Sequence, residues 1–289
     1  MDAGVLIQSI ANAVVLGSIY AMVAVGLALA FGVMKMANFA HGEFFMAGAY
    51  VVYVFYALMG LPFPLAVVLA FPVVAALGLI VERLIFRPTH GNVLAGFMAT
   101  AGVAFILQVL VGQMWGVGLM RSIPTPYMGA AEVAGAFISW QRMIIIPVTI
   151  FMVGGLWLFL NRSRAGKALR ACAQDPEAAV LQGVSLHRIS ALAMLLSGGF
   201  AGVAGALMAP IAPVTPYMGH SFVITAFIVV IVGGMASISG AVLAAFLLGF
   251  IHTFVTTWFD AVTSTMVGVL FMALVLIVKP SGLLGHAKA

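Results

Sequence analysis

The longest stretch of the chain without a charged side chain runs from residue 189 to residue 259. Other charge-free stretches cover residues 3–34, 44–81, 88–120, 143–161 and 261–278. A helix needs about 20 apolar residues to cross the roughly 30 Å of hydrocarbon in a bilayer, so the longest stretch must contain several crossings. The chain is 64% hydrophobic and only 7% charged, whereas soluble domains average about 25% charged residues. Lipid is therefore expected to be its main solvent.

The hydrophobic pattern predicts an all-α, polytopic transmembrane helical bundle of about nine spans, within a range of about eight to ten. The apolar stretches are continuous, without the alternation that the wall of a β-barrel requires. The whole chain, residues 1–289, is expected to form one transmembrane domain. The expected helices cover residues 5–33, 43–59, 63–85, 93–114, 142–160, 188–209, 221–237, 240–258 and 262–278.

The distribution of Lys and Arg predicts how the bundle is oriented, because cytoplasmic loops carry an excess of these residues. If the loop 161–187 is cytoplasmic, ten of the twelve basic residues lie inside and only Arg121 and Arg142 lie outside. An odd number of spans then places the N-terminus in the periplasm and the C-terminus in the cytoplasm. The N-terminal stretch has no basic region or obvious cleavage site, so we expect it to remain as the first span. The basic residues form no aromatic-interleaved patch, so no nucleic-acid partner is expected.

Two polar interruptions suggest broken helices. The first lies in "FGVMKMANFAHGEFFMAGAYV", residues 31–51, and the second in "APIAPVTPYMGHSFVITAFIVV", residues 209–230. In the predicted topology the first faces inward and the second outward, so the halves 1–114 and 188–278 could be inverted repeats of about four spans each. Transporters often place their pathway where such repeats meet.

Polar residues of these interruptions are the candidates for a substrate pathway. They are Asn38, His41, Glu43, Tyr217 and His220. A charge inside a bilayer costs about 2.5 to 3.5 kcal/mol on insertion scales, which makes an intramembrane carboxylate a functional candidate. The alternative for Glu43 is a place near the inner interface, where an acid in the first helical turn complements the helix dipole.

No catalytic, metal or cofactor site is expected. The single cysteine, Cys172, excludes an intrachain disulfide and a cysteine metal cluster, and the six histidines are dispersed. The chain has no G-x-S-x-G motif, and "SRAGKALR" lacks the flanking residues of a phosphate-binding loop. If transport is active, its energy must come from another subunit or from an ion gradient.

A short polar helix is predicted within the loop 161–187. Asp175 is a favoured N-cap residue, Pro176 suits the first helical position, and Glu177 complements the helix dipole. Gly183 is the expected C-terminal stop. A helix of about two turns is not stable alone. With the basic run that ends at Arg170 before it, this helix is suited to dock on a partner and transmit its motion; alternatively, the loop is ordinary and its basic residues only fix the topology.

Four stretches carry a resemblance to a known family. They are "GVMKMANFAHGEFFMAGAYVVY", "ALRACAQDPEAAVLQGVS", "AFIVVIVGGMASISGAVLAAFLLGF" and "LIVKPSGLLG". Together they resemble the permease subunits of branched-chain amino acid ABC importers, of the LivH type, along nearly the whole chain.

The resemblance implies a bacterial inner-membrane channel built from this chain and a LivM-type permease. Two ABC ATPase subunits and a periplasmic substrate-binding protein are the other implied partners, and residues 170–185 would be the coupling loop seated on an ATPase. The family also includes importers of urea, amides and other amino acids, so the resemblance leaves the solute open. The alternative function is a self-sufficient secondary transporter or channel that uses Glu43 and His41.

Overall fold

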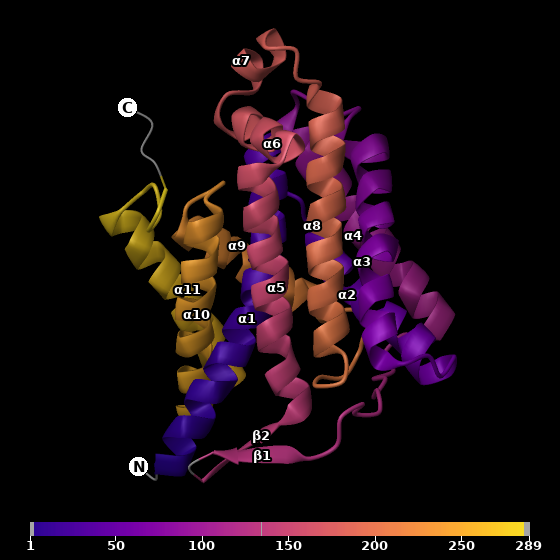
Figure 1. The fold of residues 1–289 in the computed structure, drawn as a ribbon, viewed down its shortest axis with the longest axis vertical. Helices are drawn as coiled ribbons and strands as arrows, with labels where there is room; N and C mark the ends of the chain where they lie inside the picture. The colour runs from indigo at the N-terminus through magenta and orange to yellow at the C-terminus, as the bar shows by residue number, and fades with distance from the viewer. Residues whose placement is uncertain (1–2, 134, 286–289) are drawn as a thin grey trace.

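The computed structural model describes residues 3–133 and 135–285 as a bundle of helices with one small hairpin (Figure 1). The first half contains α1 (Ala3–Met34), α2 (His41–Val52), the π-helical segment η1 (Tyr53–Leu58), α3 (Phe63–Val81), the π-helical segment η2 (Glu82–Phe86) and α4 (Val93–Trp115). The second half contains β1 (Ala130–Val133), β2 (Ala136–Ser139), α5 (Trp140–Arg162), α6 (Arg164–Gln174), α7 (Pro176–Leu181), α8 (Leu186–Met208), α9 (Met218–Gly233), α10 (Ile238–Trp258) and α11 (Ala261–Val278).

Seven of the described helices are long and apolar enough to cross a membrane. They are α1, α3 together with η2, α4, α5, α8, α10 and α11. The other two expected spans differ from the prediction: α2 gives way to the π-helical segment η1, and α9 has only 16 residues because it ends at Gly233, beside a glycine with a positive φ. The described part of the chain therefore shows a multi-pass α-helical bundle, with nine full-length spans not confirmed.

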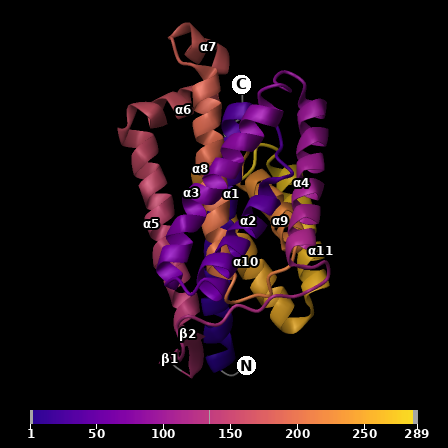
Figure 2. The same ribbon diagram turned by 90° about the vertical axis from the view of Figure 1, so that its right-hand side faces the viewer.

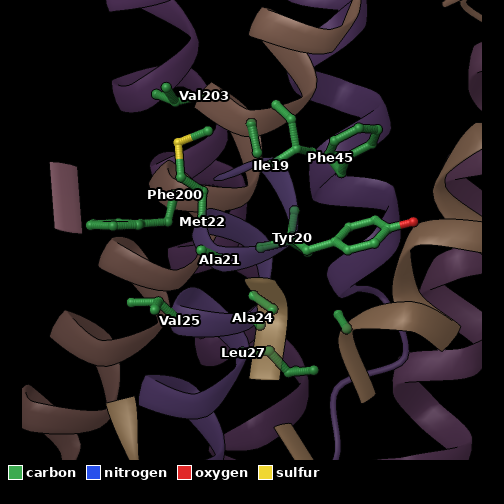
Figure 3. Packing of buried hydrophobic residues seen from close by; sticks show 14 of the residues in the cluster. Ile19, Tyr20, Ala21, Met22, Ala24, Val25, Leu27, Phe45, Phe200 and Val203 are labelled. Atoms are coloured by element: carbon green, nitrogen blue, oxygen red, sulfur yellow. The ribbon is translucent and has the colours of Figure 1, made fainter. Parts of the chain in front are cut away.

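Helix α1 forms the centre of the bundle. It packs against α8, α10, α5 and α9, and most of its length is buried. Figure 3 shows Ile19, Tyr20 and Met22 of α1 in one buried cluster with Phe45 of α2 and Phe200 of α8. In contrast, α4 and α11 present most of their apolar surface outward.

The first polar interruption is a re-entrant segment. After α1 ends at Met34, the chain turns back through Lys35, which has a left-handed φ of 54°, and α2 begins at His41. His41 Nε2 lies 2.9 Å from the carbonyl oxygen of Val23. Val23 precedes the end of α1 by 11 residues, so α2 begins about 16 Å back inside the bundle at 1.5 Å per residue.

The second interruption re-enters from the opposite end. Helix α8 ends at Met208, residues 209–217 turn back through loops, and α9 begins at Met218. The backbone of Gly219 lies directly against that of Gly42, and a Cβ atom on either glycine would overlap the other residue. Helices α2 and α9 thus both begin in the interior, where their N-terminal ends meet.

The two ends of the bundle carry different structures. The antiparallel hairpin β1–β2 lies at the same end as the start of α1, and α6 and α7 lie at the other end (Figures 1 and 2). The described end of the chain lies on the α6 side, because Leu283 N donates to the Val232 carbonyl at the end of α9. Residues 1–2 and 286–289, which hold the two termini, lie outside the described residues.

Candidate coupling helices and membrane pathway

The short helix α7 has the start and the end that the sequence predicts. The side chain of Asp175 accepts hydrogen bonds of 3.0 Å from the backbone N–H groups of Glu177 and Ala178. Pro176 occupies the first helical turn, and Gly183 has a φ of 81° just beyond the end. These features satisfy backbone groups at both ends of a helix too short to be stable by itself.

Helix α6, which precedes α7, was not predicted from the sequence. Its N-cap is Ser163, whose Oγ accepts from Gly166 N at 2.8 Å. Gly166, Leu169 and Cys172 recur at intervals of three and form the buried face against the rest of the chain. Burial raises the pKa of the Cys172 thiol. In the sequence, the signal for this helix is the spacing of three between Gly166, Leu169 and Cys172, and the basic residues between them obscure it.

The exposed faces of α6 and α7 carry the features expected of a docking surface. Arg170 on α6 is exposed and donates to Asn161 Oδ1 at 2.8 Å. On α7, Glu177 is exposed and Leu181 has 85% of its surface accessible. Val180 beside it is also exposed, so α7 presents two adjacent apolar side chains near Glu177.

A side-chain hydrogen bond adds to the packing of α6 on α1, α5 and α8. Lys35 Nζ donates to the carbonyl oxygen of Ala173, near the C-terminal end of α6, at 2.6 Å. A cation at this position also interacts favourably with the negative C-terminal end of the α6 dipole. Because Lys35 begins the first re-entrant segment, this hydrogen bond connects α6 to the chain that leads into α2.

The predicted pathway residues Asn38 and His41 are buried and engaged within the protein. Asn38 Oδ1 accepts from Ala40 N at 3.1 Å, which shapes the turn before α2. The two ring nitrogens of His41 face the Val23 carbonyl and Ser197 Oγ, at 2.9 and 3.3 Å. His41 is fully buried, so in this conformation it holds α2 between α1 and α8.

Glu43 is also buried, in the first turn of α2. Its Oε1 accepts from Gln108 Nε2 of α4 at 2.8 Å, and its Oε2 is buried without a hydrogen-bond partner among the described residues. Gln108 lies well inside α4, away from either end. Glu43 thus lies in the first turn of α2, as the alternative expected, and the re-entrant segment carries this turn into the bundle.

Tyr217 and His220 differ from the residues of the first interruption because both are exposed. Tyr217 is the N-cap residue of α9 and is 53% accessible, and His220 lies in the first turn. Gly219 between them touches Gly42, so the structure brings the two predicted interruptions together in space. Among the predicted pathway residues, only those of the second interruption are exposed to the surroundings of the chain.

The described residues contain no group of three or more His, Cys, Asp or Glu side chains that could hold a metal ion. They do contain a cavity at the hairpin end of the bundle, which includes Asn12 and Arg142 and which the sequence analysis missed. Arg142 drew attention only as a topology signal. One face of α1 changes from polar to apolar along the helix, and its residues follow helical spacing: Asn12, Val15, Leu16 and Ile19. This spacing was the sequence signal for the cavity.

Comparison with known proteins identifies the family. Residues 9–278 match the family described as the permease component of branched-chain amino acid transport systems. The chain belongs to this branched-chain amino acid transport permease family. A high-affinity permease protein of the family, BraD from Pseudomonas aeruginosa, is 34% identical, and the match covers 98% of this chain and 96% of BraD.

Other members of the permease family are similarly complete matches. The high-affinity branched-chain amino acid transport system permease protein LivH of Salmonella typhimurium is 31% identical over 98% of this chain and 96% of its own. A probable LivH of Methanocaldococcus jannaschii is 26% identical over 95% of this chain and 91% of its own. No solved structure matches the chain significantly.

Proposed function

We propose that this chain is the membrane-spanning permease subunit of an ABC importer for branched-chain or related amino acids. Full-length similarity to permease proteins of such systems carries the proposal. The chain would move solute inward without catalysing a reaction itself, and ATP would be hydrolysed on partner subunits. The alternative of a self-sufficient carrier built on Glu43 and His41 is less well supported, because both His41 nitrogens are engaged inside the protein.

The proposed assembly lies in a bacterial inner membrane. It contains this chain, a LivM-type permease, two ATPase subunits and a periplasmic binding protein. With α6 and α7 in the cytoplasm, α1 begins on the periplasmic side, and the hairpin β1–β2 faces the binding protein. Counting α2 with η1 and α9 as incomplete crossings gives nine membrane segments, and the two opposed re-entrant segments suit an inverted repeat.

Exposed polar side chains suggest where the solute passes. Tyr217 and His220 lie at the interior start of α9, where exposure to lipid would be unfavourable for a histidine. We assign this surface to the interface with the second permease, along a water-filled pathway. The three buried residues of the first interruption would then support this pathway indirectly, because they hold α2 against α9: Asn38, His41 and Glu43.

The coupling surface is proposed to comprise α7 and the exposed face of α6. Leu181 and Glu177 would enter a groove of the ATPase, and Arg170 would lie at its rim. Asp175, Pro176 and Gly183 keep α7 folded, so that the surface moves as a rigid unit. The hydrogen bond from Lys35 to α6 would pass this movement on.

Affinity purification of the tagged chain from its native membrane, followed by mass spectrometry, tests the assembly. Recovery of two ATPases and a second permease is the expected result. Recovery of this chain alone in a form that is active without ATP would overturn the proposal.

The coupling surface is tested by Glu177→Arg. Reversing this charge opposes the α7 dipole and the docking contact, so we expect the ATPase to be largely lost from the purified complex while membrane insertion is unchanged. Glu132→Arg is the matched control for ATPase recovery, because Glu132 is an exposed acid of β1 at the end of the bundle opposite α7. Normal ATPase recovery and normal coupled uptake with Glu177→Arg would contradict the assignment.

A further inference from the structure

A cavity of about 340 Å³ opens at the hairpin end of the bundle, between α1, α5, α10 and the end of α8. This volume lies at the low end of the range for small-molecule sites, about 300 to 1,000 Å³. An adjoining cavity shares Asn12 and Thr257 with it and extends to Phe137 of the hairpin. The cavity therefore continues toward the side that we propose faces the periplasm.

The mouth of the cavity is polar and carries one positive charge. Arg142 and Asn12 both line the cavity, and Arg142 donates a hydrogen bond to Asn12 Oδ1. A guanidinium has five N–H donors, so further donors remain for an anion. The hydroxyl groups of Thr256 and Thr257 line the same region, and the described lining contains no Asp or Glu. A carboxylate fits this mouth well, whereas an ammonium group would find only neutral acceptors.

The inner walls of the cavity are apolar. They are formed by Val15, Leu16, Ile19, Met208 and Ile211. Branched and flexible side chains of this kind suit an aliphatic group, whose burial contributes about 0.8 kcal/mol per CH₂. The cavity thus offers an anion-binding end and an aliphatic end within one small volume.

The floor of the cavity leads to the junction of the two re-entrant segments. His252 lines the floor, and its Nδ1 lies 3.0 Å from the hydroxyl of Tyr20. The Tyr20 ring packs edge-on against Phe222, which stacks on Phe45 with ring centroids 3.9 Å apart. Phe222 and Phe45 each lie one turn after a glycine of the contact between α9 and α2. An aromatic layer therefore separates the cavity from the interior junction.

We propose that this cavity is an outer binding site on the transport pathway. It binds a branched-chain amino acid through its carboxylate before the aromatic layer of Tyr20, Phe222 and Phe45 opens. The inference rests on the proposed function and its orientation. Arg142 binds the carboxylate, the walls hold the aliphatic side chain, and the ammonium group contributes less because the described lining has no acid to receive it. A phospholipid also combines an anionic headgroup with an aliphatic chain, so the test must distinguish a lipid from an amino acid.

The test measures binding of tritiated leucine to the purified permease and ATPase complex in the absence of the binding protein. We expect 4-methylpentanoate, which is leucine without its amino group, to displace the label. We expect 3-methylbutylamine, which lacks the carboxylate, to displace it at least tenfold less well. Equal displacement by both compounds, or no displaceable leucine binding to the wild type, would overturn the site.

Substitutions locate the binding in the cavity. Arg142→Gln is expected to weaken leucine binding about tenfold or more, since charge-assisted hydrogen bonds are the strong ones, and Arg142→Lys less. Ile19→Trp is expected to fill the inner end and abolish binding. Arg83→Gln is the control, because Arg83 is exposed on η2 and lies outside the cavity lining.

The remaining outcomes show whether the proposed site alone, or the proposed function as well, has failed. A phospholipid retained by the wild type and released by Arg142→Gln in native mass spectrometry, with leucine binding unaffected, would replace the proposal with a lipid site. Unchanged leucine binding by folded Arg142→Gln and Ile19→Trp would overturn the site alone if the complex still imports leucine with ATP. Absence of any ATP-driven leucine uptake by the wild type would overturn the proposed function as well.

Discussion

Gly42 and Gly219 are the residues at which the two re-entrant segments meet. Their backbones touch, so we predict that Gly42→Val forces α2 and α9 apart and destabilises the protein by about 2 kcal/mol or more, as overpacking does. Thermal unfolding of the purified complex measures the effect. Gly154→Val is the matched control, because a Cβ at Gly154 has no neighbour within 4 Å. A stability of Gly42→Val equal to that of the control would contradict the close contact.

We predict that the stability of the protein depends on pH through Asp260, the N-cap residue of α11. Hydrogen bonds from the hydroxyl and backbone N–H of Thr263 lower the pKa of the Asp260 carboxyl below its ordinary value. The stabilisation is therefore present above the unfolded-state pKa and is lost as the pH falls through the folded-state pKa. Asp260→Ala should lower the thermal midpoint at neutral pH, and the difference from wild type should shrink below pH of about 4. A difference that stays constant with pH would contradict this account.

Contacts of single residues could be predicted from the sequence only where they are local. The cap made by Asp175 depends on neighbours two and three positions away, so local chemistry predicts it correctly. His41 binds the carbonyl of Val23 and lies near Ser197, and these contacts depend on how three helices pack. Local pattern can indicate that such a histidine is unusual, but the packing decides that it is buried and engaged.

At the scale of elements, α6 connects the proposed docking surface to the bundle. We predict that Lys35→Gln weakens the contact with Ala173 and lowers solute uptake per ATP hydrolysed severalfold, while the ATPase still co-purifies. Lys35→Arg keeps the charge and should retain most of the coupling. Uptake and phosphate release in proteoliposomes measure the ratio. An unchanged ratio in Lys35→Gln would show that motion does not pass through this contact.

The long helices could be predicted well and the re-entrant ones poorly. Boundaries of α10 and α11 agree with the expected 240–258 and 262–278 within two residues, because apolar length and flanking polar residues determine them. Helix α9 has the same apolar composition as a full span, yet it begins at the contact between Gly219 and Gly42. Hydropathy is similar for a helix that crosses lipid and for one that ends inside a protein, so it does not separate them.

At the scale of the whole molecule, the two ends of the chain carry different structures. The hairpin lies at one end, and α6 and α7 lie at the other (Figures 1 and 2). The cavity lies at the hairpin end. Between them, α2 and α9 begin at a shared interior junction. The outward apolar faces of α4 and α11 remain for lipid or for the proposed second permease. Family membership and overall helical class could be predicted from sequence, whereas the cavity depends on four helices that are distant in the chain.

Uptake of labelled leucine into proteoliposomes is the most direct test of the account. The complete complex, with the binding protein outside and ATP inside, should accumulate leucine, and removal of ATP or replacement of Glu177 by Arg should abolish accumulation. The chain alone should transport nothing. Leucine transport by the chain alone without ATP would contradict energy input through α7, and Glu43 would then be the first residue to replace.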